Sequence, residues 1–141
     1  MAINVTKTLS ERIQAHEAPI MKRKFPQFAL FQGDPSLPFA SNGELFWGGT
    51  LTTNFGSSFS VAVVYPASYP HGQTKVFVRE LMGVRTPHKY VDGHLCLYSN
   101  DHGGGGEGIG TETTAAALLG WAAAWLNAWE VYQRSGNWPG R

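Results

Sequence analysis

Cys96 is the only cysteine in the chain, and it lies in the segment TPHKYVDGHLCLY at residues 86–98. Two histidines, His88 and His94, and the carboxylate of Asp92 precede it. Asp92 and Gly93 form a turn signal, so Cys96 is expected just after a turn and shortly before a glycine-rich segment at 101–110. A thiol in such a place can be a nucleophile, a metal ligand or a small buried apolar side chain.

The residues alone leave these three roles open. The sequence Leu-Cys-Leu around Cys96 is typical of a core segment, which favours a buried structural cysteine. A metal site would draw its ligands from four residues, His88, His94, Cys96 and His102, but no paired CxxC or HExxH spacing fixes a geometry. A papain-like nucleophile lacks its local signature here.

The first element expected around these residues is an N-terminal helix. Thr8 and Glu11 have the spacing of a capping box, and Leu9 and Ile13 begin an apolar stripe behind them. Pro19 is expected to end or kink this helix.

Four short β-rich runs then predict an antiparallel meander. They are FALF, ELFWGGTLTT, FSVAVVY and KVFVREL, and pieces rich in glycine and proline separate them. The third run alternates Phe59, Val61, Val63 and Tyr65 with smaller residues, which is typical of a half-buried strand.

The final segment, residues 111–136, predicts a long helix. An apolar stripe that would face the sheet is formed by Leu118, Ala122, Trp125, Trp129 and Tyr132. Thr111 is placed to cap its start and Gly136 to end it. The three tryptophans of this helix are interpreted as core residues rather than as a ligand cage.

Composition restricts the function classes. The 141 residues, 43% of them hydrophobic, predict one α+β domain over 1–141. The net charge of +1 gives no case for nucleic acid or an anionic membrane, and no apolar run approaches the ~20 residues of a bilayer span. The N-terminus has no apolar signal core, and a single cysteine suits a reducing compartment, so a cytoplasmic location is expected.

The order of the motifs resembles ubiquitin-conjugating enzymes over roughly residues 9 to 136. The pattern W..G.L......F.V.V.YP..YP runs from Trp47 to Pro70, and Gly93-His94-Leu95-Cys96-Leu97 matches the family's G-x-[IL]-C-L segment around its active-site cysteine. Thr86-Pro87-His88 stands where the family has His-Pro-Asn. The ending WL..WE.Y..SG.WP, from Trp125 to Pro139, is similar to that of stand-alone bacterial relatives in ubiquitin-like antiphage operons.

The resemblance implies a fold and an activity. The fold is a ubiquitin-conjugating (UBC) domain: an N-terminal helix, a four-stranded antiparallel meander, an active-site loop and a long C-terminal helix. The activity is that of a transferase that carries a ubiquitin-like modifier as a thioester on Cys96 and passes it to an amine of a target protein, in bacterial antiphage defence. The implied partners are the modifier, an ATP-dependent activating enzyme and a target, without metal or cofactor.

The same resemblance assigns roles to further residues. His88 replaces the family's asparagine, and it could donate a hydrogen bond to the oxyanion, take a proton from the amine, or only hold the loop. Supporting positions near the thiol are expected to be Tyr90, Asp92, Asp101 and His102. The activating enzyme is expected at the basic first helix, through Arg12, Lys22 and Arg23.

A second functional class stays open from the sequence. A catalytically silent UBC domain would only bind a modifier or a nucleotide-signalling synthase. Such members of the family typically lack the cysteine, so Cys96 beside Gly93 and His88 favours the enzyme.

Overall fold

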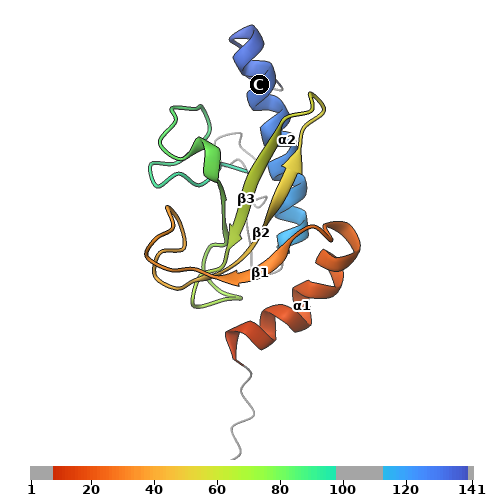
Figure 1. Ribbon diagram of the computed structural model, residues 1–141, viewed down its shortest axis with the longest axis vertical. Coiled ribbons are helices and arrows are strands. Elements are labelled where there is room, and N and C mark those ends of the chain that lie inside the picture. The colour runs from red at the N-terminus through yellow and green to blue at the C-terminus, as the bar shows by residue number, and fades with distance from the viewer. Residues whose placement is uncertain (1–7, 98–112, 140–141) are drawn as a thin grey trace, which may run out of the picture.

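The computed structural model describes residues 8–97 and 113–139, which form one four-stranded sheet and two α-helices (Figure 1). In chain order the elements are α1 (Leu9–Lys24), β1 (Ala29–Gln32), β2 (Leu45–Thr52), β3 (Ser58–Val64), β4 (Lys75–Val78), the 3₁₀ helix η1 (Arg79–Leu81) and α2 (Ala115–Ser135). The strand order β1-β2-β3-β4 with antiparallel pairing confirms the predicted meander and the α+β fold.

The first helix begins as predicted and continues past its proline. Thr8 Oγ1 accepts from the Glu11 amide at 3.1 Å, while Glu11 Oε1 accepts from the Thr8 amide at 2.9 Å, so the capping box is present. Of the two effects predicted for Pro19, an end or a kink, the end is wrong, because α1 runs on to Lys24. Pro19 is exposed, so water can solvate the carbonyl that loses its partner, and buried side chains at Glu17 and Met21 hold the turns on both sides.

The second helix, α2, begins later than expected. Thr114 is its N-cap and accepts from the Ala117 amide at 3.1 Å, so the predicted cap Thr111 is not the residue that caps α2, and Thr111 itself lies outside the described residues. Gly136 ends the helix as predicted, in the left-handed conformation at φ 81°. Among the described residues, neither α1 nor α2 is long and apolar enough to cross a membrane.

Both faces of the sheet are covered, which corrects the half-buried interpretation of the third strand. One face packs against α1 and α2 through residues such as Trp47, Val61 and Val63. The opposite face carries Phe46, Ala62, Val64 and Phe77, which pack against Phe39 and Ala40 of the long β1–β2 connection. Residues 61–64 of β3 are therefore all buried, because a connection distant in sequence covers the face that alternation assigned to solvent.

A buried carboxylate joins α1, the sheet and α2. Glu17 is 4% exposed, and it accepts hydrogen bonds from the hydroxyls of Tyr65 and Tyr69 at 2.9 and 3.0 Å. It also accepts from the Ala115 amide at 2.7 Å, at the first turn of α2, where the helix dipole favours a negative charge. Trp47 Nε1 donates to the Tyr65 hydroxyl at 2.8 Å. The tryptophan and tyrosines of the sequence pattern thus belong to one hydrogen-bonded cluster.

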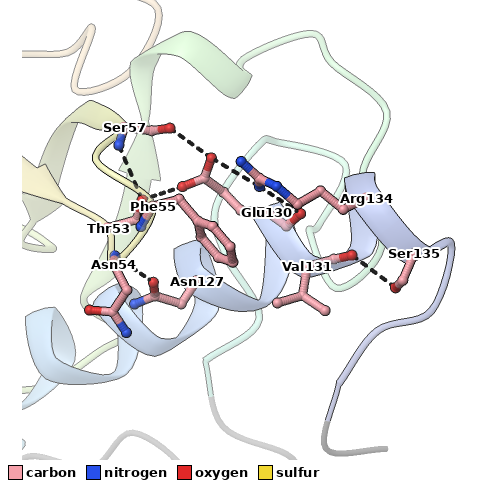
Figure 2. A network of polar contacts seen from close by, with 9 residues as sticks. All are labelled: Thr53, Asn54, Phe55, Ser57, Asn127, Glu130, Val131, Arg134 and Ser135. Carbon is pink, nitrogen blue, oxygen red and sulfur yellow. Dashed lines mark hydrogen bonds and ion pairs between the residues drawn. The ribbon is translucent and has the colours of Figure 1, made fainter.

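A second buried carboxylate fixes the β2–β3 turn to α2 (Figure 2). Glu130 accepts from the hydroxyls of Thr53 and Ser57, the latter at 2.7 Å. Asn127 Oδ1 accepts from the Asn54 amide at 2.9 Å, and the guanidinium of Arg134 lies 4.0 Å over the Phe55 ring. Burial alone would raise the pKa of Glu130, but the hydrogen bonds from Thr53 and Ser57, together with the charge of Arg134, outweigh it and lower that pKa. The glutamate of the WE.Y ending therefore holds the sheet against the helix that faces the active-site loop.

Candidate active site

Cys96 lies at the end of a loop that is fastened to the sheet edge. His94 pairs with Phe77 of β4 in an antiparallel bridge, and the Leu95 amide donates to the Val76 carbonyl at 2.8 Å. Leu95 is 2% exposed and supplies the core contact, whereas Cys96 is only partly buried. The interpretation of Cys96 as a buried core cysteine is therefore wrong, because its neighbour occupies the core.

Gly93 forms the tight turn before the cysteine. Its φ is +99°, and an added Cβ would lie 2.8 Å from Met82 Cε. The Gly93 amide donates to the Tyr90 carbonyl at 2.9 Å, and the Tyr90 amide donates to the His94 carbonyl at 2.9 Å. The glycine of the G-x-[IL]-C-L segment is needed because a side chain would be strained at this φ, and the end of the Met82 side chain would also have to move.

His88 has a backbone conformation that is uncommon for a residue other than glycine, with φ 57°. Its carbonyl accepts from the Cys96 amide at 2.9 Å and from Trp125 Nε1 at 3.0 Å. Its imidazole lies against the indole of Trp138, with ring centroids 4.9 Å apart. Residues from α2 and from the segment after it thus fix the loop that carries His88 beside Cys96.

A groove of about 270 Å³ opens at the cysteine. His88, Cys96 and Leu97 form one side, and α2 with the following segment forms the other through Trp121, Ala124, Trp125, Ala128, Trp138 and Pro139. An acyl group on Cys96 would therefore meet aromatic and small apolar side chains.

The tryptophans of α2 divide between core and groove. Trp129 is buried in the core as predicted, but Trp121 is 39% exposed and lines the groove. Trp125 is buried and also lines the groove. Interpreting all three as core was wrong for Trp121, and the sequence analysis missed the contacts of Trp125 and Trp138 with His88. The family-like ending of the chain was the one signal that pointed to them.

Tyr90 touches the thiol directly. Cys96 Sγ donates to the Tyr90 hydroxyl at 3.7 Å, and the phenol ring stacks on the imidazole of His94 with centroids 4.3 Å apart. Asp92 does not line the groove. Its carboxylate instead accepts from Lys75 Nζ at 2.8 Å and pairs with His94 Nδ1 at 2.5 Å.

The electrostatics of this cluster follow from its burial and hydrogen bonds. Burial alone would raise the pKa of Asp92, but hydrogen bonds from Lys75 and His94 outweigh it and lower that pKa to about 2. Burial lowers the pKa of His94, although Asp92 opposes the shift. Near neutral pH the cluster therefore holds a carboxylate and a neutral imidazole, whose Nδ1–H donates to Asp92.

The lowered pKa of His94 predicts a dependence of stability on pH. Because the unfolded chain takes up a proton at the ordinary histidine pKa of ~6.5 and the folded protein does so only at lower pH, stability is expected to fall as the pH decreases through ~6.5. Urea unfolding at pH 7.5 and 5.5 checks this, with His94→Phe as the comparison. The decrease should be smaller in the variant, and an equal decrease in both proteins would contradict the assignment.

The other predicted site residues lie apart from the thiol or outside the described residues. Arg12 Nη2 donates to the Tyr69 carbonyl at 3.1 Å, and Lys22 and Arg23 are exposed at the end of α1. Asp101 and His102 lie outside the described residues. Within 8–97 and 113–139 no three His, Cys, Asp or Glu side chains are grouped to hold a metal ion, and His94 is directed to Asp92 and Tyr90.

Comparison with known families adds an independent finding. A family described as "Type II CBASS E2 protein" matches residues 17–141, which include the cysteine loop, α2 and the residues that line the groove. No curated protein and no solved structure matched the chain.

Proposed function

Because the chain belongs to the type II CBASS E2 family, an E2-like group of bacterial antiphage conjugation systems, we propose that it carries a ubiquitin-like modifier as a thioester on Cys96 and transfers it to an amine. The observation that carries the proposal is the position of Cys96. Its thiol is partly exposed, contacts Tyr90, and shares a groove with His88, while the neighbouring Leu95 fastens the loop to the core.

The first step is an exchange of thioesters. The Cys96 thiolate attacks the carbonyl carbon at the modifier's C-terminus, a new C–S bond forms, and the thiolate of an ATP-dependent activating enzyme leaves. The incoming acyl group is already activated, so the small thiolate fraction of a free cysteine near neutral pH is sufficient.

The second step transfers the acyl group to a target. An amine attacks the thioester carbon, a C–N bond forms, the C–S bond breaks, and the amine gives up a proton. The negative charge that develops on the carbonyl oxygen needs a nearby donor. His88 lies on the same groove as Cys96 and is the residue proposed for that role.

The experiment mixes the protein with ATP and with the modifier and activating enzyme encoded nearest to it, followed by non-reducing gels. A thiol-sensitive adduct is expected with the wild-type chain. It should be lost in Cys96→Ala and become resistant to thiols in Cys96→Ser, because an oxygen ester replaces the thioester.

The control is the activating enzyme alone, which must itself form a thioester with the modifier in the same reaction. If the activating enzyme forms its thioester but no adduct appears on Cys96, the proposed transferase activity is contradicted. That result would favour a UBC domain that only binds its partners.

A further inference from the structure

His94 lies between Tyr90, the residue that contacts the thiol, and the edge of the sheet, so its contacts come from its own loop and from β4. It is 7% exposed, its ring stacks on Tyr90 at 19° between planes, and its other neighbour is the edge of Phe77 at 6.2 Å between centroids.

The orientation of the imidazole is fixed from both ends of the turn. Asp92 Oδ1 pairs with Nδ1 of His94 at 2.5 Å and also accepts from its backbone amide at 3.0 Å. Lys75 of β4 holds the second oxygen of Asp92 at 2.8 Å, which ties this carboxylate to the sheet. These contacts hold the ring of His94 with its face toward Tyr90.

His94 Nε2 supports the assignment of a neutral ring. It is buried without a hydrogen-bond partner among the described residues. An unprotonated nitrogen is less costly to bury in this way than an N–H, and the Nδ1–H donated to Asp92 leaves Nε2 unprotonated. The ring thus acts on Tyr90 by packing rather than through a proton.

We propose that Tyr90 is a catalytic residue that hydrogen-bonds the sulfur of Cys96, and that His94 is the positioning residue that holds the phenol there. In the free enzyme the thiol donates to the phenol oxygen at 3.7 Å. When the amine displaces the sulfur from the acyl carbon, the electron pair of the C–S bond goes to sulfur, and the Tyr90 O–H donates to the thiolate that leaves. The proton released by the amine goes to solvent or to His88.

This inference rests on the proposed thioester on Cys96, but its test needs neither the modifier nor the activating enzyme. The N-acetylglycyl thioester of 2-mercaptoethanesulfonate charges Cys96 by thiol exchange, and Cys96 is the only cysteine, so the mass of the acylated chain reports a single site. Discharge to hydroxylamine is then followed by intact mass spectrometry.

Tyr90→Phe is expected to slow discharge ~10-fold, because a hydrogen bond to a developing charge is lost. His94→Ala and His94→Asn should each slow discharge by about the same factor. The discharge rate of His94→Phe, which keeps a ring against Tyr90, should stay within ~3-fold of wild type. In the double variant Tyr90→Phe/His94→Ala the loss should remain ~10-fold rather than reach ~100-fold, since the two residues act as one unit. His16→Ala, an exposed histidine on α1, is the matched control and should be unchanged.

A wild-type rate in Tyr90→Phe, additive losses in the double variant, or a His94→Phe rate as low as that of His94→Asn would overturn the proposal. Circular dichroism verifies that each variant is folded. If His94→Ala does not fold, the discharge rates of His94→Asn and His94→Phe are compared instead, and this comparison tests the proposal. Alkylation by iodoacetamide is the second measurement, and Tyr90→Phe should slow it ~3-fold because the attacking sulfur loses its hydrogen-bond partner. Failure of the modifier to load would leave these results intact, so the two proposals fail separately.

Discussion

His88→Ala is expected to slow the discharge of acylated Cys96 ~100-fold while its charging changes by less than ~3-fold. The reason is that the donor of a hydrogen bond to the oxyanion acts most when the amine attacks, whereas charging begins from an acyl group that the activating enzyme also holds. Single-turnover assays that follow each step on gels measure the two rates.

His88→Asn is the matched control for backbone and chemistry. Asparagine tolerates the φ of 57° found at this position, and it is the residue that the resembling family carries in its tripeptide. Its amide can donate to an oxyanion but cannot take up a proton from the amine near neutral pH. Retention of discharge within ~10-fold of wild type supports the oxyanion role, and a loss as large as that of alanine supports the base.

Equal loss in charging and discharge, or no loss in either, would contradict both roles of His88. Equal loss would agree with a residue that only shapes the loop. A loop-shaping role would agree with the backbone contacts of His88, because its carbonyl accepts hydrogen bonds from the Cys96 amide and from Trp125 Nε1.

Glu17→Ala is expected to lower the free energy of unfolding by ~3–5 kcal/mol. The substitution leaves three buried donors without their acceptor: the hydroxyls of Tyr65 and Tyr69 and the amide of Ala115. It also opens a cavity between α1 and α2, because the side chain is 4% exposed. Urea unfolding at neutral pH measures the change.

Lys22→Ala is the control on the same helix, since this side chain is exposed, and it should cost less than ~0.5 kcal/mol. Tyr65→Phe in the Glu17→Ala background should then cost less than Tyr65→Phe alone, because the hydroxyl has already lost its acceptor. A loss below ~1 kcal/mol for Glu17→Ala would mean that water satisfies the three donors, and that the cluster contributes little to stability.

The sequence by itself determined the features that depend on near neighbours. The capping box of Thr8 and Glu11, the four strands in their meander and the glycine that ends α2 were all confirmed. Turn chemistry and alternation act over a few residues, and strands that follow one another in the sequence usually pair with each other. The ordered motif around Cys96 also led to the correct family, because it combines several weak local patterns in one order.

The tertiary structure decided which side chains surround the thiol. Trp125 meets the His88 carbonyl across 37 positions in the chain, Lys75 meets Asp92 across 17, and Glu17 meets the start of α2 across 98. No local pattern encodes such pairs, because each depends on where the sheet edge and α2 place two distant segments. For the same reason alternation misjudged β3, whose second face is covered by the β1–β2 connection. His94 illustrates the difference, since the sequence left its role open, with metal binding as one weak alternative, whereas the fold sets the ring between Tyr90, Phe77 and Asp92.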